Sequence, residues 1–131
     1  MNNQIALDTS AYTLLGKGNT RVADLVSNAT YLGLPLPVLG EIYFGIYGGL
    51  LEHKNKTALS RFLNNDRVTL LQINESTAKI FGEIAAELRT AGKPIQQNDI
   101  WIAALCKQHG YSLLTADKGF KHIIGLDVIW C

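Results

Sequence analysis

Short apolar runs alternate with longer segments of helical periodicity along most of this sequence. Extended segments are predicted at residues 5–7, 34–39, 68–73, 112–114 and 127–130. Helical periodicity is found at residues 22–29, 53–63, 75–90 and 99–109. This alternation predicts an α/β fold, a three-layer sandwich with a mainly parallel five-stranded sheet, and 131 residues suit one domain spanning 1–131.

Two prolines shape the second extended run. Pro35 and Pro37 push the residues before them toward extended geometry, so the whole run 34–39 is expected to be extended. A helix that contains Glu41 is expected to follow it. The sheet would then receive its second strand from this proline-containing run.

Capping signals set the ends of the two clearest helices. The sequence Gly-Lys-Pro at 92–94 predicts the end of the helix at 75–90. Asn98 is predicted to be the N-cap of the helix at 99–109, and Gly110 to end it. Because that second helix is apolar on nearly every side, we expect it in the core.

Composition excludes several classes of protein. Twelve Lys and Arg against eleven Asp and Glu give a net charge of +1, which argues against a histone-like nucleic-acid binder and against an acidic tail protein. Residues 1–8 lack the basic start of a signal peptide, and the most apolar stretch, 42–51, is about half the ~20 residues that span a bilayer. Cys106 and Cys131 form neither a disulfide framework nor a metal-ligand spacing. We expect a soluble cytoplasmic protein with reduced thiols and no membrane contact.

Acidic side chains follow three of the predicted strands. Asp8 comes directly after the first strand, Glu41 soon after the second and Asp117 just after the fourth, while Asp99 opens the apolar helix. Because ligands bind beyond the carboxyl ends of parallel strands, we expect these four side chains to converge there. Two carboxylates about 4 Å apart repel by about 4 kcal/mol at an effective dielectric near 20, so a divalent cation would stabilise the cluster.

Oxygen ligands without nearby His or Cys favour Mg²⁺ or Mn²⁺. The chemistry typical of such a site is metal-assisted hydrolysis of a phosphodiester, which needs no Ser or Cys nucleophile. Each residue also has a purely structural interpretation. Asp8 and Asp99 suit the start of a helix, Glu41 suits a solvated helix position, and Asp117 suits a surface turn.

Four segments in this order resemble the PIN-domain family, and most of all the VapC-type toxins of prokaryotic toxin–antitoxin pairs. They are residues 7–10, 41–45, 98–104 and 114–120. The resemblance implies a five-stranded parallel sheet between helices, an acidic Mg²⁺ or Mn²⁺ site and endoribonuclease activity. It also implies an RNA substrate, a small antitoxin that covers the site, and a homodimer.

The resemblance assigns roles to seven residues. Asp8, Glu41 and Asp99 match the acidic triad of the family, and Asp117 matches its fourth, less uniform acidic position. Thr9, Ser10 and Thr115 lie where family members often place a hydroxyl near the metal waters, although helix capping is an equally good interpretation. One departure is the glycine-rich segment 43–49, which leaves the length of its helix open.

Without the four proposed ligands, seven acidic residues face twelve basic ones, an excess that suits a phosphate backbone. Candidate phosphate contacts are Lys54, Lys56, Arg61, Arg67, Lys118, Lys121 and His122. The aromatic candidates for base stacking or for receiving an antitoxin helix are Tyr12, Tyr43, Phe44 and Tyr47, with core packing as the alternative.

Two other functions fit parts of the pattern. A non-catalytic PIN-like module that binds RNA or a protein would use the same acidic residues only as caps and turns. A phosphoryl-accepting receiver domain would also have an acidic metal site, but it needs an acidic residue at the end of the third strand. Residues 70–74 supply none.

Overall fold

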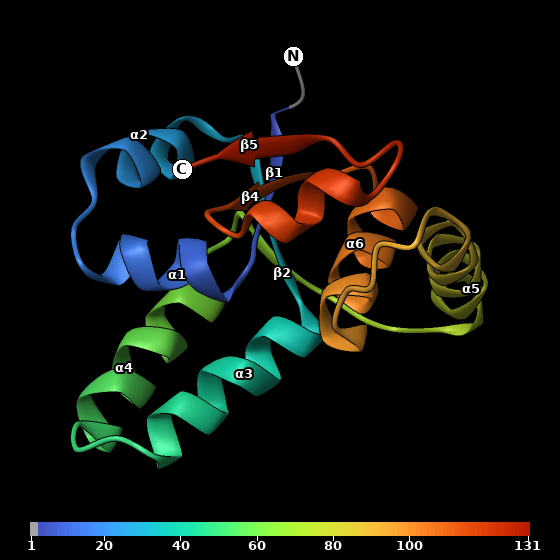
Figure 1. Ribbon diagram of the computed structural model, residues 1–131. Helices are drawn as coiled ribbons and strands as arrows, with labels where there is room; N and C mark the ends of the chain where they lie inside the picture. The colour runs from blue at the N-terminus through green and yellow to red at the C-terminus, as the bar shows by residue number, and fades with distance from the viewer. Residues whose placement is uncertain (1–2) are drawn as a thin grey trace.

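The computed structural model describes residues 3–131, which form one sheet with helices on both faces (Figure 1). The strands are β1 (Gln4–Leu7), β2 (Tyr31–Pro35), β3 (Val68–Leu71), β4 (Ser112–Thr115) and β5 (Val128–Trp130). The helices are α1 (Thr9–Gly16), α2 (Thr20–Asn28), α3 (Leu36–Tyr47), α4 (Glu52–Leu63), α5 (Glu75–Ala91) and α6 (Gln97–His109), with a short 3₁₀ helix η1 (Lys118–His122).

The sheet has the strand order β3-β2-β1-β4-β5, and all its pairings are parallel. The predicted α/β fold class is confirmed, with a sheet that is entirely rather than mainly parallel. The chain starts in the middle of the sheet, builds outward through β2 and β3, and then returns to the other side of β1. This reversal between β1 and β4 is a topological switch point, where open α/β sheets bind their ligands.

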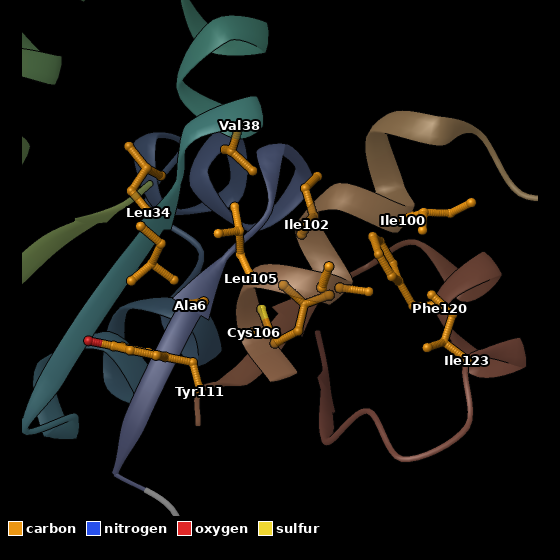
Figure 2. Close-up of a cluster of buried hydrophobic side chains, with 14 of the residues drawn as sticks. Ala6, Leu34, Val38, Ile100, Ile102, Leu105, Cys106, Tyr111, Phe120 and Ile123 are labelled. Carbon is orange, nitrogen blue, oxygen red and sulfur yellow. The ribbon is translucent and has the colours of Figure 1, made fainter. Parts of the chain in front are cut away.

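Alternation along the strands divides the core into two layers, one on each face. Ala6 of β1 (Figure 2) and Leu113 of β4 belong to the cluster formed with α3, α5 and α6. Their neighbours Leu7 and Leu114 belong to the cluster formed with α1 and α2. Side chains on a strand point to alternate faces, so near-continuous apolar runs are expected where both faces of a parallel sheet are covered.

The expectation that residues 34–39 are all extended is wrong. The strand ends at Pro35, which is the N-cap of α3 with ψ of 138°, and the helix begins at Leu36. Pro37 lies in the first turn of this helix, where a backbone N–H has no intrahelical partner and the fixed φ of proline is already helical. The glycine-rich segment does not shorten the helix, which continues through Gly45 to Tyr47.

The predicted ends of α5 are confirmed, whereas the predicted start of α6 is wrong. Asn74 caps α5 through a capping box with Thr77, and Gly92 ends the helix with φ of 66°. Gln96 is the N-cap of α6 and makes no side-chain capping bond, so Asn98 lies inside the first turn instead of capping it. None of the helices in residues 3–131 has both the length and the apolarity that a bilayer crossing requires.

Candidate functional site

The four acidic side chains lie on four segments that meet beyond the carboxyl ends of the strands. Asp8 follows β1 and is the N-cap of α1, and Asp117 follows β4 and is the N-cap of η1. Because β1 and β4 are neighbours in the sheet, these two residues flank the switch point. Glu41 lies in the second turn of α3, and Asp99 in the first turn of α6. The starts of α1, α3 and α6 face the same end of the sheet (Figure 1).

Asp8 is buried, and its carboxylate is held by three donors. Oδ1 accepts the backbone N–H of Ala11 at 2.9 Å and the hydroxyl of Ser10 at 2.6 Å. Oδ2 accepts the hydroxyl of Thr115 at 2.5 Å. The capping role expected for Asp8 is therefore present, and the same bonds fix the direction of the carboxylate.

Ser10 and Thr115 connect Asp8 to the loop that carries Asp117. The Ser10 hydroxyl accepts the N–H of Ala116 at 3.0 Å, and the Thr115 hydroxyl accepts the N–H of Asp117 at 2.9 Å. Thr115 has no exposed surface. Neither hydroxyl acts as a simple helix cap, since both link a carboxylate to the backbone of another segment.

Thr9 makes the corresponding link to α3. Its hydroxyl donates to Oε1 of Glu41 at 3.0 Å, across 32 positions of sequence. Glu41 is exposed and has a long, rotatable side chain. The bond from Thr9 therefore restrains the rotation of its carboxylate. All three hydroxyls singled out from the sequence thus contact acidic residues or the backbone beside them.

Asp99 has a different environment. It is partly buried, and within residues 3–131 its carboxylate has no hydrogen-bond partner. The pKa of Asp99 is raised to about 6, first by burial and then by the negative charges of Asp117, Glu41 and Asp8, in that order. The carboxylates of Asp117, Glu41 and Asp8 therefore each lie within electrostatic reach of Asp99.

Within residues 3–131, no group of three or more His, Cys, Asp or Glu side chains is placed so that it could hold a metal ion. The acidic side chains that act on Asp99 are those of Asp117, Glu41 and Asp8, and their carboxylate oxygens differ from the Cys and His ligands of a structural zinc site. Mg²⁺ and Mn²⁺ sites commonly have this composition, with waters and substrate phosphate as the other ligands. The donor types therefore suit such an ion, while the spacing of the side chains forms no metal site among residues 3–131.

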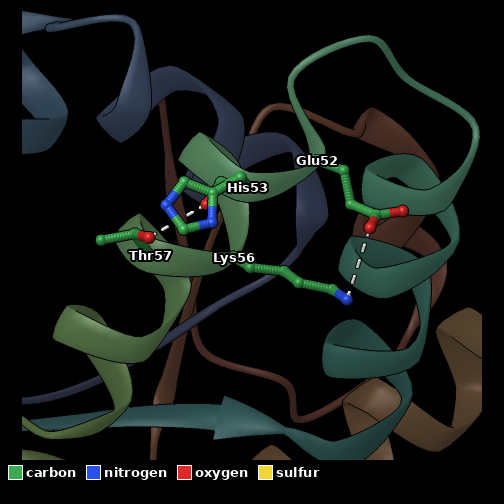
Figure 3. Close-up of polar contacts among 4 residues, drawn as sticks. All are labelled: Glu52, His53, Lys56 and Thr57. Atoms are coloured by element: carbon green, nitrogen blue, oxygen red, sulfur yellow. Dashed lines mark hydrogen bonds and ion pairs between the residues drawn. The ribbon is translucent and has the colours of Figure 1, made fainter.

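Two of the predicted phosphate contacts already have partners within the chain. The Arg67 guanidinium donates to the carbonyls of Val26 at 3.0 Å and Ala29 at 2.8 Å, where it satisfies the end of α2. Lys56 forms an ion pair with Glu52 at 3.6 Å, one turn away on α4 (Figure 3). As phosphate contacts all seven candidates stay predictions, and Lys118 and Lys121 among them are exposed on η1, directly after Asp117.

The aromatic candidates divide into two groups. Phe44 is 83% exposed and Tyr47 is 61% exposed, so core packing is wrong for both. Tyr43 is half-buried against the core, and Tyr12 packs edge-on against Phe62 with the ring centroids 5.5 Å apart.

A groove beside the carboxylates was not predicted from the sequence. It lies between α1, α3 and α4 and has a volume of about 590 Å³. Thr9 and Glu41 line the part next to the carboxylates, and Lys17 and Lys54 also line it. Lys17 carried no sequence signal, because a lysine after a helix end is usual on any protein surface.

Comparison with known proteins agrees with this geometry. The family described as PIN domain matches residues 5–126. Ribonuclease VapC2 of Haemophilus influenzae is 34% identical over 89 residues, which are 67% of this chain and 66% of that relative, slightly less than two thirds of its length. Ribonuclease VapC4 of Mycobacterium tuberculosis is 28% identical over 97 residues, which are 74% of this chain and 75% of that relative.

Solved structures match over almost the whole chain. VapBC2 from Rickettsia felis, bound to a DNA fragment from its promoter, has a TM-score of 0.88 at 22% identity, with 98% of both chains covered. VapBC-1 from nontypeable Haemophilus influenzae has a TM-score of 0.85 at 26% identity, with 97% of both chains covered. The fold and strand order described above are therefore those of known structures.

Proposed function

Because this chain belongs to the PIN domain family, we propose that it is a metal-dependent endoribonuclease that acts as the toxin of a toxin–antitoxin pair. The observation that carries the proposal is the electrostatic environment of Asp99. Three carboxylates from other segments raise its pKa beyond the effect of burial, and no cation balances this charge in residues 3–131. Such an unfavourable arrangement is typical of sites built for function rather than for stability.

We propose that the bound ion is Mg²⁺ or Mn²⁺ and that its ligands come from Asp8, Glu41, Asp99 and Asp117. When bound, such an ion supplies a Lewis acid for the phosphoryl oxygens and a water of lowered pKa. The chain orients the ligands. Ser10 and Thr115 fix the carboxylate of Asp8 relative to the Asp117 loop.

We propose RNA as the substrate, which the printed names of the relatives support, since they are ribonucleases. We propose that an antitoxin protein is the partner, as the similar solved structures are VapBC assemblies. Phe44, Tyr47 and Leu50 offer exposed apolar surface at the corner between α3 and α4, where such a partner could bury it. The homodimer implied by the family resemblance stays a prediction, and light scattering on the purified protein measures it.

The proposed function is tested by incubating structured and single-stranded RNAs with purified protein in Mn²⁺, Mg²⁺ or EDTA. Wild type is expected to cleave with metal and not with EDTA. Asp99→Asn keeps the shape of the side chain but removes a ligand charge, so cleavage should fall by at least ~10²-fold, more than loss of an outer-shell partner typically costs.

Asp8→Ala serves as a second variant that lacks a proposed ligand, and it is purified in the same way. Lys56→Ala serves as a purification control, because Lys56 lies outside the proposed ligands and pairs with Glu52. Equal activity of wild type and Asp99→Asn would contradict the assigned site. Inertness of wild type on every RNA would instead favour a binding module without catalysis.

A further inference from the structure

The groove between α1, α3 and α4 begins at the carboxylates and carries two lysines farther along. Lys17 follows the last turn of α1, while Thr9 begins that helix next to Glu41. Eight residues of α-helix rise about 12 Å, and a stacked nucleic-acid strand rises about 3.4 Å per nucleotide. Lys17 is thus about three nucleotides from the carboxylates along α1.

We propose that this groove binds the stretch of single-stranded RNA that flanks the cleaved phosphodiester, with Lys17 and Lys54 contacting its phosphates. This inference rests on the proposed function and assigns a substrate-binding subsite to it. The first argument is charge. The ion pair recorded within residues 3–131 joins Lys56 and Glu52, so the ammonium groups of Lys17 and Lys54 have no acidic partner there.

The position of Lys54 is not explained by the stability of its own helix. Lys54 is exposed in the first turn of α4, where the helix dipole disfavours a positive charge. Glu52, in the same turn, carries the charge that the dipole favours. A phosphate bound in the groove would balance the charge of Lys54.

The walls of the groove suit bases. Tyr12 and the exposed Leu51 supply an aromatic and an aliphatic surface, and the edge contact with Phe62 restrains the ring of Tyr12. Unpaired bases are typically recognised on such surfaces, while lysines position the backbone without reading sequence. A volume of about 590 Å³ lies within the range of pockets that hold small organic ligands, so a nucleotide can enter.

The test measures binding of a fluorescein-labelled 12-nucleotide single-stranded RNA of mixed sequence, in the Asp99→Asn background so that the RNA stays intact. Affinity is measured as a function of salt for Lys17→Ala, Lys54→Ala and the double variant. Each lysine that contacts a phosphate of single-stranded RNA contributes about 0.7 to the slope of log affinity against log salt. The double variant should therefore lose about 1.4 from this slope and bind several-fold more weakly.

Lys56→Ala is the matched control, since it removes the same charge from the same helix. Lys56 pairs with Glu52 (Figure 3). It does not line the groove, and its ammonium lies 4.8 Å from the centre of the Tyr47 ring. It is expected to change the slope less than either groove variant. Lys17→Arg with Lys54→Arg keeps both charges and should restore the slope.

In the active protein, the double alanine variant should raise KM for RNA with little change in kcat, because the lysines bind the substrate away from the reacting bond. An unchanged slope and KM would overturn the subsite, and would indicate that the lysines serve a protein partner. The two proposals fail separately. If the protein binds RNA through these lysines but does not cleave it, the subsite is supported and the nuclease activity is not. If it cleaves RNA with metal and the lysine variants have no effect, the nuclease activity is supported and the subsite is not.

Discussion

Asp8 and Asp99 are both aspartates at helix starts, yet their carboxylates have opposite surroundings. Asp8 accepts hydrogen bonds from two hydroxyls and one backbone N–H. Asp99 has no such donor within residues 3–131, and its pKa is raised to about 6. One carboxylate is thus held in place by the fold, while the other has no donor that fixes its direction within residues 3–131.

This difference predicts how metal binding depends on pH. Below its pKa of about 6, Asp99 is protonated, so a cation must displace a proton in order to bind. The affinity for Mn²⁺ should fall by about tenfold per pH unit below that value and level off above about pH 7. Calorimetric titration at several pH values measures this dependence. Affinity that stays constant from pH 5 to 7 would contradict the role of Asp99, and Asp99→Asn should lack the inflection.

Thr115 supplies a second prediction at this scale. Thr115→Val keeps the shape of the buried side chain but removes the donor to Asp8 and the acceptor for the N–H of Asp117. The free energy of unfolding should fall by about 1–3 kcal/mol, because buried polar groups lose their partners, and RNA cleavage should fall as well. Urea unfolding and the cleavage assay measure the two effects.

Thr115→Ser retains the hydroxyl and should keep most of the activity. Thr57→Val is a matched control for loss of a threonine hydroxyl, since Thr57 donates only to the carbonyl of His53 on the surface of α4 (Figure 3). If Thr115→Val is as stable and active as the control, the hydroxyl does not position Asp8.

At the level of secondary-structure elements, the site depends on how closely strands and helices approach one another. Gly33 lies in β2, the strand that leads into α3 and Glu41. A Cβ at this position would come within 3.0 Å of both Leu71 on β3 and the ring of Tyr111. The lack of a side chain at Gly33 allows this packing.

Gly33→Ala is therefore expected to lower the free energy of unfolding by about 1–3 kcal/mol through overpacking. Gly82→Ala should have the opposite sign and raise it by about 0.4–1 kcal/mol, because Gly82 is exposed on α5 with open space around its Cβ position. Denaturant unfolding of both variants measures the contrast. A stabilised Gly33→Ala would show that Tyr111 moves aside without cost.

For the whole molecule, the raised pKa of Asp99 makes the stability of the fold depend on pH. The ordinary pKa of Asp99 is 3.8 and the value in the fold is about 6, so the folded state binds this proton more tightly than the unfolded chain. The stability that this proton contributes is fully present below pH 3.8 and is lost as the pH rises through about 6. At neutral pH the metal-free protein therefore carries an electrostatic cost that a cation would remove.

Two measurements of thermal or urea unfolding at pH 7.5 test this electrostatic cost. Without metal, Asp99→Asn should be more stable than wild type by up to about 1 kcal/mol, since partly exposed charges are screened by solvent. Mn²⁺ at 100 times its dissociation constant should stabilise wild type by about 2.7 kcal/mol and the variant much less. Equal stabilisation of both proteins would place the metal elsewhere.

Local patterns in the chain were sufficient for most of the elements and for the order of the acidic residues. Periodicity and glycine stops predicted α5 and the end of α6, since both signals act within one or two turns. Local patterns gave the wrong start for α3, because a proline is unfavourable inside a helix but favourable in its first turn. Pro37 lies in the first turn of α3.

Tertiary structure decided which residues meet. Thr115 reaches Asp8 across 107 positions because β1 and β4 are adjacent, and Thr9 reaches Glu41 because α1 lies beside α3. The groove with Lys17 and Lys54 likewise exists only where three helices pack together. Strand order and helix packing come from long-range burial of apolar surface, which no local pattern in a single sequence specifies.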